Sequence, residues 1–249
     1  MTGATSGIGE ALARHYAARG AAVGLVARRA DALARVAGSL APAEVATWAC
    51  DVRDAAALAA AGAAFIARFG VPDVVIANAG VSRGTLTEHA EDLRAFARVI
   101  ETNVLGVVHT FHPFVAPMRE ARRGTLVGIA SVAGYRGLPG AGAYSASKAA
   151  AIAYLESLRV ELRGSGVAVV TICPGFVATP MTSANPYPMP FLIDAGTAAR
   201  RIARAIAARR RFAVVPWPMG LLGRVLRVMP RPLYDAALAG RKRKPRRPD

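Results

Sequence analysis

The feature that most constrains the fold is an alternation of helical patterns with short apolar runs along a chain of 249 residues. The apolar runs are nearly continuous, which is typical of parallel strands covered by helices on both faces. The alternation therefore predicts a doubly wound α/β fold, with ligands bound at the carboxyl ends of the strands. Helices are expected at 7–19, 30–39, 54–69, 90–122, 143–163 and 196–210, and strands at 22–27, 45–50, 74–77, 124–130 and 167–173.

A glycine-rich turn opens the chain. Residues 2–9 read TGATSGIG, and a run of strong helix formers follows. Gly3 and Gly7 can adopt backbone angles that are closed to other residues, and Gly9 allows the helix to approach a sheet or a ligand closely. The N–H groups at such a helix start can hold a pyrophosphate. The turn indicates nucleotide binding, with an ordinary helix-initiating turn as the alternative.

A tyrosine and a lysine lie four residues apart in the run from Tyr144 to Lys148. In a helix they share one face, so the phenol and the ammonium point into the same space. A neighbouring ammonium favours the phenolate and lowers the pKa of the phenol, which makes Tyr144 a candidate general acid/base. Alone, the pair could equally be a surface Tyr beside a solvated Lys. Ser131 lies thirteen residues upstream, where its hydroxyl could stabilise charge on a substrate oxygen.

Together with four further matches, these segments resemble the short-chain dehydrogenase/reductase family. The resemblance runs from Thr2 to about Pro180, with the motifs in the family's order. It implies a Rossmann-type domain and an oxidoreductase that moves a hydride between a nicotinamide and a carbonyl or alcohol carbon. The further matches are C-D-V at 50–52, N-A-G at 78–80, Asn103, and P-G-x-x-x-T at 174–179.

The resemblance also implies roles for individual residues. Tyr144 would exchange the proton, Ser131 would hydrogen-bond the substrate oxygen, and Asn103 would hold a water in a proton relay. Lys148 would lower the pKa of Tyr144 and bind the nicotinamide ribose. The implied cofactor-binding residues are Gly3, Thr5, Ser6, Gly7, Ile8, Gly9, Arg28, Arg29, Asp51, Val52, Asn78, Ala79, Gly80, Tyr144, Lys148, Pro174, Gly175, Val177 and Thr179.

The end of the second expected strand bears on the choice between NADP and NAD. Proteins that prefer NAD often place an acidic residue there, on the ribose 2′-hydroxyl. Here Ala27 stands at that place, and Arg28 and Arg29 follow. A guanidinium can bind a 2′-phosphate in a bidentate manner, so we expect NADP(H), with NAD as the alternative. Two solvated arginines at a helix start are the plainer interpretation.

Composition limits the class of protein. Residues counted as hydrophobic make up 53% of the chain, which indicates a globular domain, and no apolar run reaches the length of a membrane span. Cys50 and Cys173 end apolar runs and suggest no disulfide framework, and no residues show metal-ligand spacing. We therefore expect a cytoplasmic enzyme without a metal, and no specific nucleic-acid partner.

The expected substrate is small and apolar. The loops at 132–142 and 178–194 should line its pocket, and they contain no Lys and one Arg. A homo-oligomer, dimer or tetramer, is expected. A catalytically weak NADP-binding scaffold or sensor is the alternative to an enzyme, because a fold alone does not fix a function. The apolar side chains expected to line the pocket are Tyr135, Leu138, Tyr187, Met189, Phe191 and Leu192.

The two ends of the chain depart from the family pattern. Only Met1 precedes the turn, so the first central strand is missing from the given chain, and we expect the natural chain to begin upstream. Residues 1–199 are expected to form the dinucleotide-binding and catalytic domain, and 200–249 a basic extension. The extension holds 15 Lys and Arg against 2 Asp and Glu. Its apolar helix and polybasic tail at 241–247 could contact an anionic membrane, or the helix could cover the pocket or join subunits.

Overall fold

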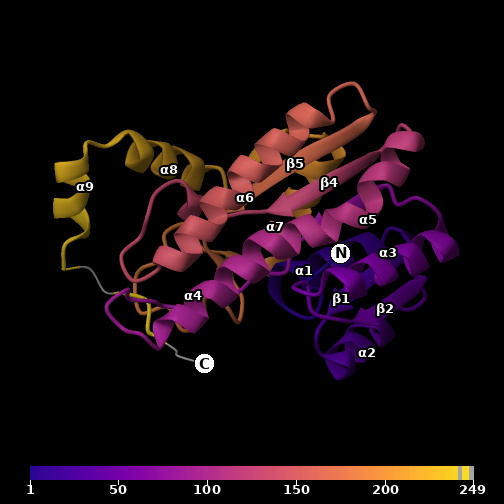
Figure 1. Cartoon of the computed structure of the whole chain (residues 1–249), viewed down its shortest axis with the longest axis horizontal. Helices are drawn as coiled ribbons and strands as arrows, with labels where there is room; N and C mark the ends of the chain where they lie inside the picture. The colour runs from indigo at the N-terminus through magenta and orange to yellow at the C-terminus, as the bar shows by residue number, and fades with distance from the viewer. Residues whose placement is uncertain (241–242, 247–249) are drawn as a thin grey trace.

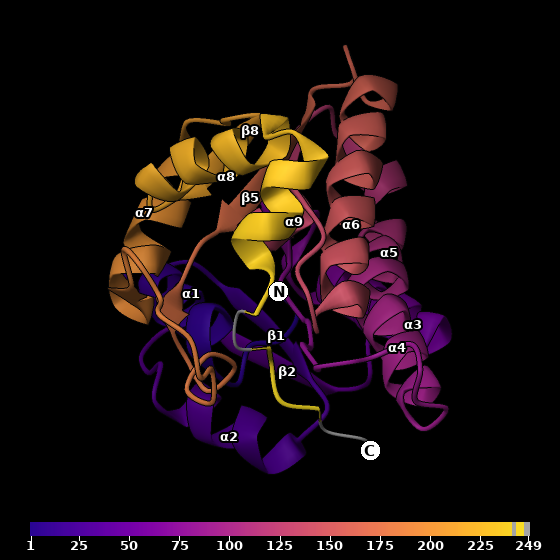
Figure 2. The same ribbon diagram turned by 90° about the vertical axis from the view of Figure 1, so that its left-hand side faces the viewer.

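A computed structural model describes residues 1–240 and 243–246. It confirms the predicted α/β architecture, in which a parallel sheet lies between two layers of helices (Figures 1 and 2). The order of elements in the first half is α1 (Gly7–Ala17), β1 (Val23–Ala27), α2 (Ala30–Gly38), β2 (Val45–Ala49), α3 (Ala55–Phe69), β3 (Val74–Ala77), α4 (Asp92–Ile100), a π-helical turn (Glu101–Leu105) and α5 (Gly106–Glu120). The second half continues with β4 (Gly124–Ile129), a 3-10 turn (Val132–Gly134), α6 (Gly142–Glu161), β5 (Val167–Pro174), β6 (Val177–Ala178), β7 (Ile193–Asp194), α7 (Ala195–Ala207), β8 (Phe212–Val215), α8 (Pro218–Val228) and α9 (Arg231–Leu238).

The central sheet has a different hydrophobic core on each face. Its strands run in the order β3-β4-β5-β8, all parallel. Because successive side chains of a strand point to opposite faces, Val127 packs with α1 and α7, whereas the preceding Leu126 packs with α5 and α6. Gly128 provides room on the second face, since a Cβ there would lie 2.4 Å from Leu155 Cδ1. Helices on both faces explain the apolar runs seen in the sequence.

The chain start lies between β1 and β3. The Met1 amine donates to Gly24 O at 2.6 Å, Val26 N donates to Met1 O at 2.9 Å, and Thr2 N donates to Ile76 O at 3.0 Å. In the described part of the chain no strand fills this place, as the sequence led us to expect, and β1 and β2 form a separate pair. A cavity of about 490 Å³, with a largely apolar lining, lies between the two sheets.

The C-terminal residues are joined to the body more closely than expected. The predicted boundary at 199–200 falls inside α7, and β8, which the sequence did not predict, pairs with the end of β5. The long predicted helix at 90–122 is divided by the π-helical turn. Of the expected polybasic tail, residues 241, 242 and 247 lie outside the described residues.

Candidate active site

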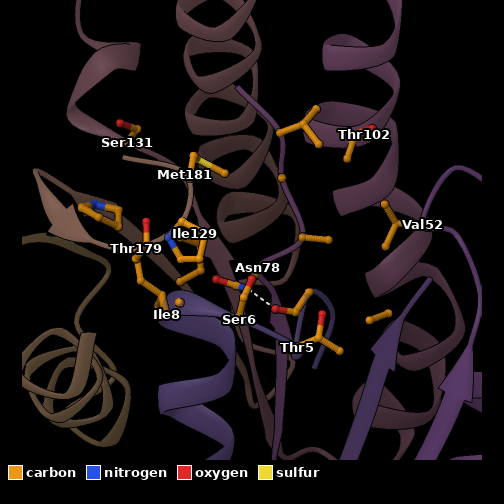
Figure 3. A pocket seen from close by; sticks show the side chains of 18 of the residues that line it. Thr5, Ser6, Ile8, Val52, Asn78, Thr102, Ile129, Ser131, Thr179 and Met181 are labelled. Atoms are coloured by element: carbon orange, nitrogen blue, oxygen red, sulfur yellow. Dashed lines mark hydrogen bonds between the residues drawn. The ribbon is translucent and has the colours of Figure 1, made fainter. Parts of the chain in front are cut away.

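A cleft of about 340 Å³ opens at the carboxyl ends of the strands. In Figure 3, Ser131 and Thr179 lie on one side of it and Val52 and Thr102 on the other. All but two of the predicted site residues line this cleft; the exceptions are Gly9 and Asn103. The lining residues are Gly3, Thr5, Ser6, Gly7, Ile8, Ala27, Arg28, Arg29, Cys50, Asp51, Val52, Asn78, Ala79, Gly80, Val81, Thr102, Ile129, Ala130, Ser131, Tyr144, Lys148, Pro174, Gly175, Val177, Thr179, Pro180, Met181 and Thr182.

The glycine-rich turn forms one wall of the cleft. Gly3 and Gly7 have φ angles of +66° and +56°, which residues other than glycine rarely adopt. Ser6 is the N-cap residue of α1 but makes no side-chain capping bond. The first N–H groups of α1 are therefore available to a bound group, and a helix start favours an anion. A Cβ at Gly7 would lie 3.0 Å from Thr179 Cγ2, so the lack of a side chain at Gly7 allows the turn to pack against Thr179.

Gly9 serves packing rather than the cleft. A Cβ there would lie 2.1 Å from Gly3 O and 2.5 Å from Asn78 Nδ2. Asn78 Nδ2 in turn donates to Thr2 O and Gly3 O, both at 3.1 Å. Gly9 thus allows α1 to approach the turn that Asn78 braces, and its contact with the cofactor stays a prediction.

Tyr144 and Lys148 both belong to α6, as predicted, and Ser131 ends the loop after β4. The Ser131 hydroxyl forms a hydrogen bond with Tyr144, which lowers the pKa of the phenol. Burial has the larger effect and raises the pKa of Tyr144 above its ordinary value. The lowering expected from Lys148 is not seen, because desolvation of the phenol dominates, although the Lys148 ammonium lies over the Tyr144 ring, 5.8 Å from its centroid.

Lys148 is buried at the floor of the cleft. Its side chain is 4% exposed, and Nζ donates to Ile129 O at 2.8 Å. Burial without a carboxylate partner lowers the pKa of the ammonium to about 8. The amine is therefore about one pH unit below its charge transition at pH 7, and it lines the cleft, where a hydroxyl oxygen of a bound group could accept a hydrogen bond from it.

Asn103 lies behind the cleft, in the π-helical turn between α4 and α5. Its side chain is fully buried and clamps Val81, accepting from Val81 N at 2.8 Å and donating to Val81 O at 2.9 Å. Its amide also donates to Ser147 Oγ on α6 at 3.0 Å. These bonds fix the Val81 loop and α6 to the π-helical turn, and the expected role of Asn103 in holding a water stays a prediction.

The far end of the cleft carries charge. Arg28 and Arg29 line it, as predicted, together with Asp51. Arg28 NH1 lies 4.0 Å from Asp51 Oδ2, and Arg53 NH2 lies 2.9 Å from the same oxygen. Hydrogen bonds from Arg53 outweigh desolvation and hold the pKa of Asp51 below its usual value. The Arg28 side chain is 53% exposed, so its weak pairing with Asp51 leaves it able to reach another anion.

The predicted substrate residues do not line this cleft. Tyr135 points toward the C-terminal helices, since a Cβ at Gly223 would lie 2.4 Å from its ring. Phe191 and Leu192 are 54% and 45% exposed and lie beside α7. Sequence reasoning missed Val81, Thr102 and the run 180–182, which carry no motif of their own. Val81 could have been found because it follows β3, and residues 180–182 because they follow the P-G-x-x-x-T segment.

Two classes of site find no support in the described ranges. No cluster of His, Cys, Asp and Glu there could hold a metal ion. Nor is any described helix both long enough and apolar enough to cross a membrane.

Comparison with known proteins identifies the family of the chain. The model of the family described as short chain dehydrogenase matches residues 1–187. An uncharacterized oxidoreductase of Myxococcus xanthus is 40% identical over 244 residues, covering 95% of this chain and 94% of the relative.

Two solved structures bring nucleotides into the comparison. A short-chain dehydrogenase/reductase from Burkholderia phymatum in complex with NAD has a TM-score of 0.82 and 29% identity, covering 98% of this chain and 95% of that one. An alcohol dehydrogenase from Thermococcus sibiricus complexed with 5-hydroxy-NADP has a TM-score of 0.76 and 29% identity, covering 86% and 93%. The chain belongs to the short-chain dehydrogenase/reductase family, and it is an oxidoreductase acting on alcohol or carbonyl groups.

Proposed function

We propose that this enzyme uses NADP(H) to interconvert an apolar carbonyl compound and its alcohol, with Tyr144 as the general acid/base. The observation that carries this proposal is the meeting of Ser131, Tyr144 and Lys148 in one cleft beside an uncapped helix start. When bound, the nicotinamide supplies or accepts a hydride. The protein's part is then to hold the substrate oxygen and to exchange one proton with it.

The proton is the task of Tyr144. Its phenol reaches the cleft and is hydrogen-bonded to Ser131, so the two hydroxyl groups can grip a substrate oxygen between them. During reduction Tyr144 donates its proton to that oxygen, and during oxidation it removes one. At pH 7 Lys148 keeps a charged ammonium within the same cleft, where it can stabilise a developing phenolate.

The NADP preference rests on the charged end of the cleft. Arg28 and Arg29 line it where an NAD-preferring protein often has an acid, and Ala27 offers none. The likeness to structures holding NAD and an NADP derivative is compatible with either cofactor. A scaffold or sensor without catalysis is the competing function, and the complete Ser131, Tyr144 and Lys148 set favours an enzyme.

The test is oxidation of NADPH, followed by absorbance, against a panel of aromatic and aliphatic aldehydes and ketones. The parent should turn over apolar members, and Tyr144→Phe should lose about two to four orders of magnitude in the chemical step while still binding NADPH. Retained turnover in Tyr144→Phe would remove the tyrosine from the chemistry. Turnover of none of the panel, with NADPH bound, would favour the sensor.

A homo-oligomer is also proposed. Along α4 and the π-helical turn, Leu93, Phe96 and Leu105 are 61%, 39% and 46% exposed. Contact between their apolar surface and water is unfavourable, and a subunit interface would bury it. Light scattering should give a dimer or tetramer, and Phe96→Arg should shift it toward the monomer. A monomeric parent at micromolar concentration would contradict this.

Contact with an anionic membrane is proposed on a second surface. Trp217, Leu221, Val225 and Val228 form one apolar stripe on α8, exposed by 74%, 61%, 48% and 81%. Exposed arginines at 224, 227 and 231 flank it, a pattern typical of interfacial helices. Co-sedimentation with vesicles of phosphatidylserine and phosphatidylcholine should exceed that with phosphatidylcholine alone and weaken with salt. Leu221→Glu should abolish binding to the anionic vesicles, whereas Val160→Glu, at an exposed position of α6, should not. Equal binding of the parent to both kinds of vesicle would refute the proposal.

A further inference from the structure

The described end of the chain is anchored on α4. Arg246 Nε lies 2.8 Å from Asp92 Oδ2, and its NH2 group lies 2.6 Å from Glu91 Oε1. The Asp92 side chain is 2% exposed, and the same Oδ2 accepts a hydrogen bond from Leu86 N at 2.8 Å. A carboxylate this well buried needs partners. Arg246 helps to cover the Asp92 carboxylate and supplies its charged partner.

Residues 243–246, here called the C-terminal strap, pass over two glycines. A Cβ at Gly84 would lie 2.4 Å from Pro245 O, and one at Gly140 would lie 2.8 Å from Arg243 Cβ. Gly84 also forms a parallel bridge with Arg246, and Lys244 Nζ donates to Ser82 Oγ at 2.7 Å. The strap thus lies directly on the backbone of the 82–85 loop, with no room for a side chain beneath it.

The two loops under the strap lead to the catalytic groups. Thr85 N donates to Gly140 O at 3.1 Å, and Thr85 forms a bridge with Ala141. Ala141 is the N-cap residue of α6, which carries Tyr144. At its other end the 82–85 loop follows Val81, which lines the cleft and is clamped by Asn103. The strap therefore covers the joint between the loop after β3 and the start of the catalytic helix.

Helices α8 and α9 lead the chain to this place (Figure 2). Arg136, from the loop before α6, donates to Leu226 O and Met229 O, both at 2.6 Å, and its guanidinium lies 3.9 Å from the centre of the Tyr234 ring. Tyr234 is 7% exposed and donates to Gly137 O. The C-terminal helices and the strap thus grip the same loop, at 135–141, from both of its ends.

We propose that the C-terminal strap, fastened by Arg246 to Asp92 and Glu91, bounds the entrance of the cleft beside Val81 and the start of α6 and limits the size of the carbonyl compound admitted. This rests on the proposed function. A bulky substrate must displace the strap, whereas a small one reacts beneath it. Arg246 is in these terms a specificity-determining residue that acts through the strap and touches no reacting atom.

The test uses three variants of the full chain. Gly84→Ala removes the space that Pro245 occupies, and Arg246→Ala removes the cation. Gly137→Ala is the matched control, because a Cβ there meets nothing within 4 Å and the Gly137 carbonyl is kept. Amide hydrogen exchange in the peptides covering 82–86 and 243–246 reports whether the strap is docked, and needs no activity. Exchange there should quicken by about tenfold or more in the first two variants and stay unchanged in the control.

Access is then measured in two ways. Acrylamide quenching of bound NADPH fluorescence should become stronger in Gly84→Ala and Arg246→Ala without any turnover being required. The ratio of kcat/KM for 4-phenylbenzaldehyde to that for benzaldehyde should rise about tenfold or more, because Arg246→Ala removes charge-assisted hydrogen bonds to both Asp92 and Glu91, and losing even one such bond is worth about tenfold. Gly137→Ala should match the parent in both.

The outcomes separate the two proposals. Faster exchange with unchanged quenching would overturn the strap as a barrier, and unchanged exchange in Arg246→Ala would overturn Arg246 as its anchor. Stronger quenching without turnover of either aldehyde would support the strap and reject the proposed substrate class. A change in KM for both aldehydes by the same factor, with the ratio kept, would overturn the claim of size selection.

Discussion

Replacing Lys148 by Met should stabilise the folded protein at pH 7 while abolishing turnover. The side chain is 4% exposed, and its Nζ donates to Ile129 O at 2.8 Å. Met keeps an unbranched chain of similar length and carries no charge. The substitution therefore removes a buried ammonium with little change in shape, and isolates the cost of keeping a catalytic amine in an apolar place.

The magnitude follows from the pKa. Burial lowers the pKa of Lys148 from 10.5 to about 8. At about 1.4 kcal/mol per pKa unit, the charged amine costs about 3 kcal/mol in the folded state. Losing the hydrogen bond to Ile129 O offsets this by about 1 kcal/mol, which leaves a net gain of about 2 kcal/mol. For a protein of this size that is a rise in Tm of about 4–8 °C.

The sign of the pH dependence provides the sharper test. At pH 7 the amine is charged in both states, so the parent bears the full cost. Between pH 8 and 10.5 the unfolded chain binds more protons than the folded protein, so the stability of the parent rises with pH over this window. Lys148→Met lacks this gain, and its advantage should vanish or reverse by about pH 10.5.

Urea unfolding of both proteins at pH 7 and pH 10 measures this, and the titrations that the two share cancel in the difference. A difference in the free energy of unfolding that is the same at both pH values would refute the reasoning, because an uncharged contact would then explain it.

Three further predictions test the cofactor end, the turn and the chain start. Arg28 and Arg29 replaced together by Ala should weaken NADPH binding about ten- to a hundredfold and NADH binding little, with Arg35→Ala on α2 as the control; equal losses would contradict a 2′-phosphate contact. Gly9→Ala should lower the free energy of unfolding by several kcal/mol, about 2 or more, because its Cβ would meet Gly3 O at 2.1 Å, while Gly38→Ala, with nothing within 4 Å, should leave it almost unchanged. Four β-branched residues added before Met1 should raise Tm by filling the cavity between β1 and β3, and the same length rich in proline should not.

The sequence identified the elements of the fold well, because their patterns are local. The five predicted strands match the structure to within about a residue at each end, since buried parallel strands read as apolar runs. β8 was missed because its four residues precede prolines and their burial depends on pairing with β5, which no local pattern reports. The π-helical turn was equally hidden, since its bulge is fixed by the bonds from Asn103 to Val81.

The candidate site was predictable for a related reason. Its residues follow strand ends, and strand ends gather at one edge of a parallel sheet. The sequence did not predict in which direction the surroundings shift the pKa of each group. The direction of the pKa of Tyr144 depends on a balance between burial, which raises it, and the bond to Ser131, which lowers it. That balance exists only in three dimensions, so the expectation from the spacing of Tyr144 and Lys148 had the opposite sign.

The C-terminal charge shows the same limit most clearly. From composition, the basic residues past 200 form one group suited to an anionic surface. In the structure they divide, because Arg246 meets Asp92 and Glu91, which lie 154 and 155 residues earlier, whereas Arg224 and Arg227 face outward on α8. The strap and the α8 stripe therefore draw on different residues. A loss of vesicle binding in Leu221→Glu should leave substrate selection intact, and release of the strap in Arg246→Ala should leave vesicle binding nearly intact, since it removes one charge of many.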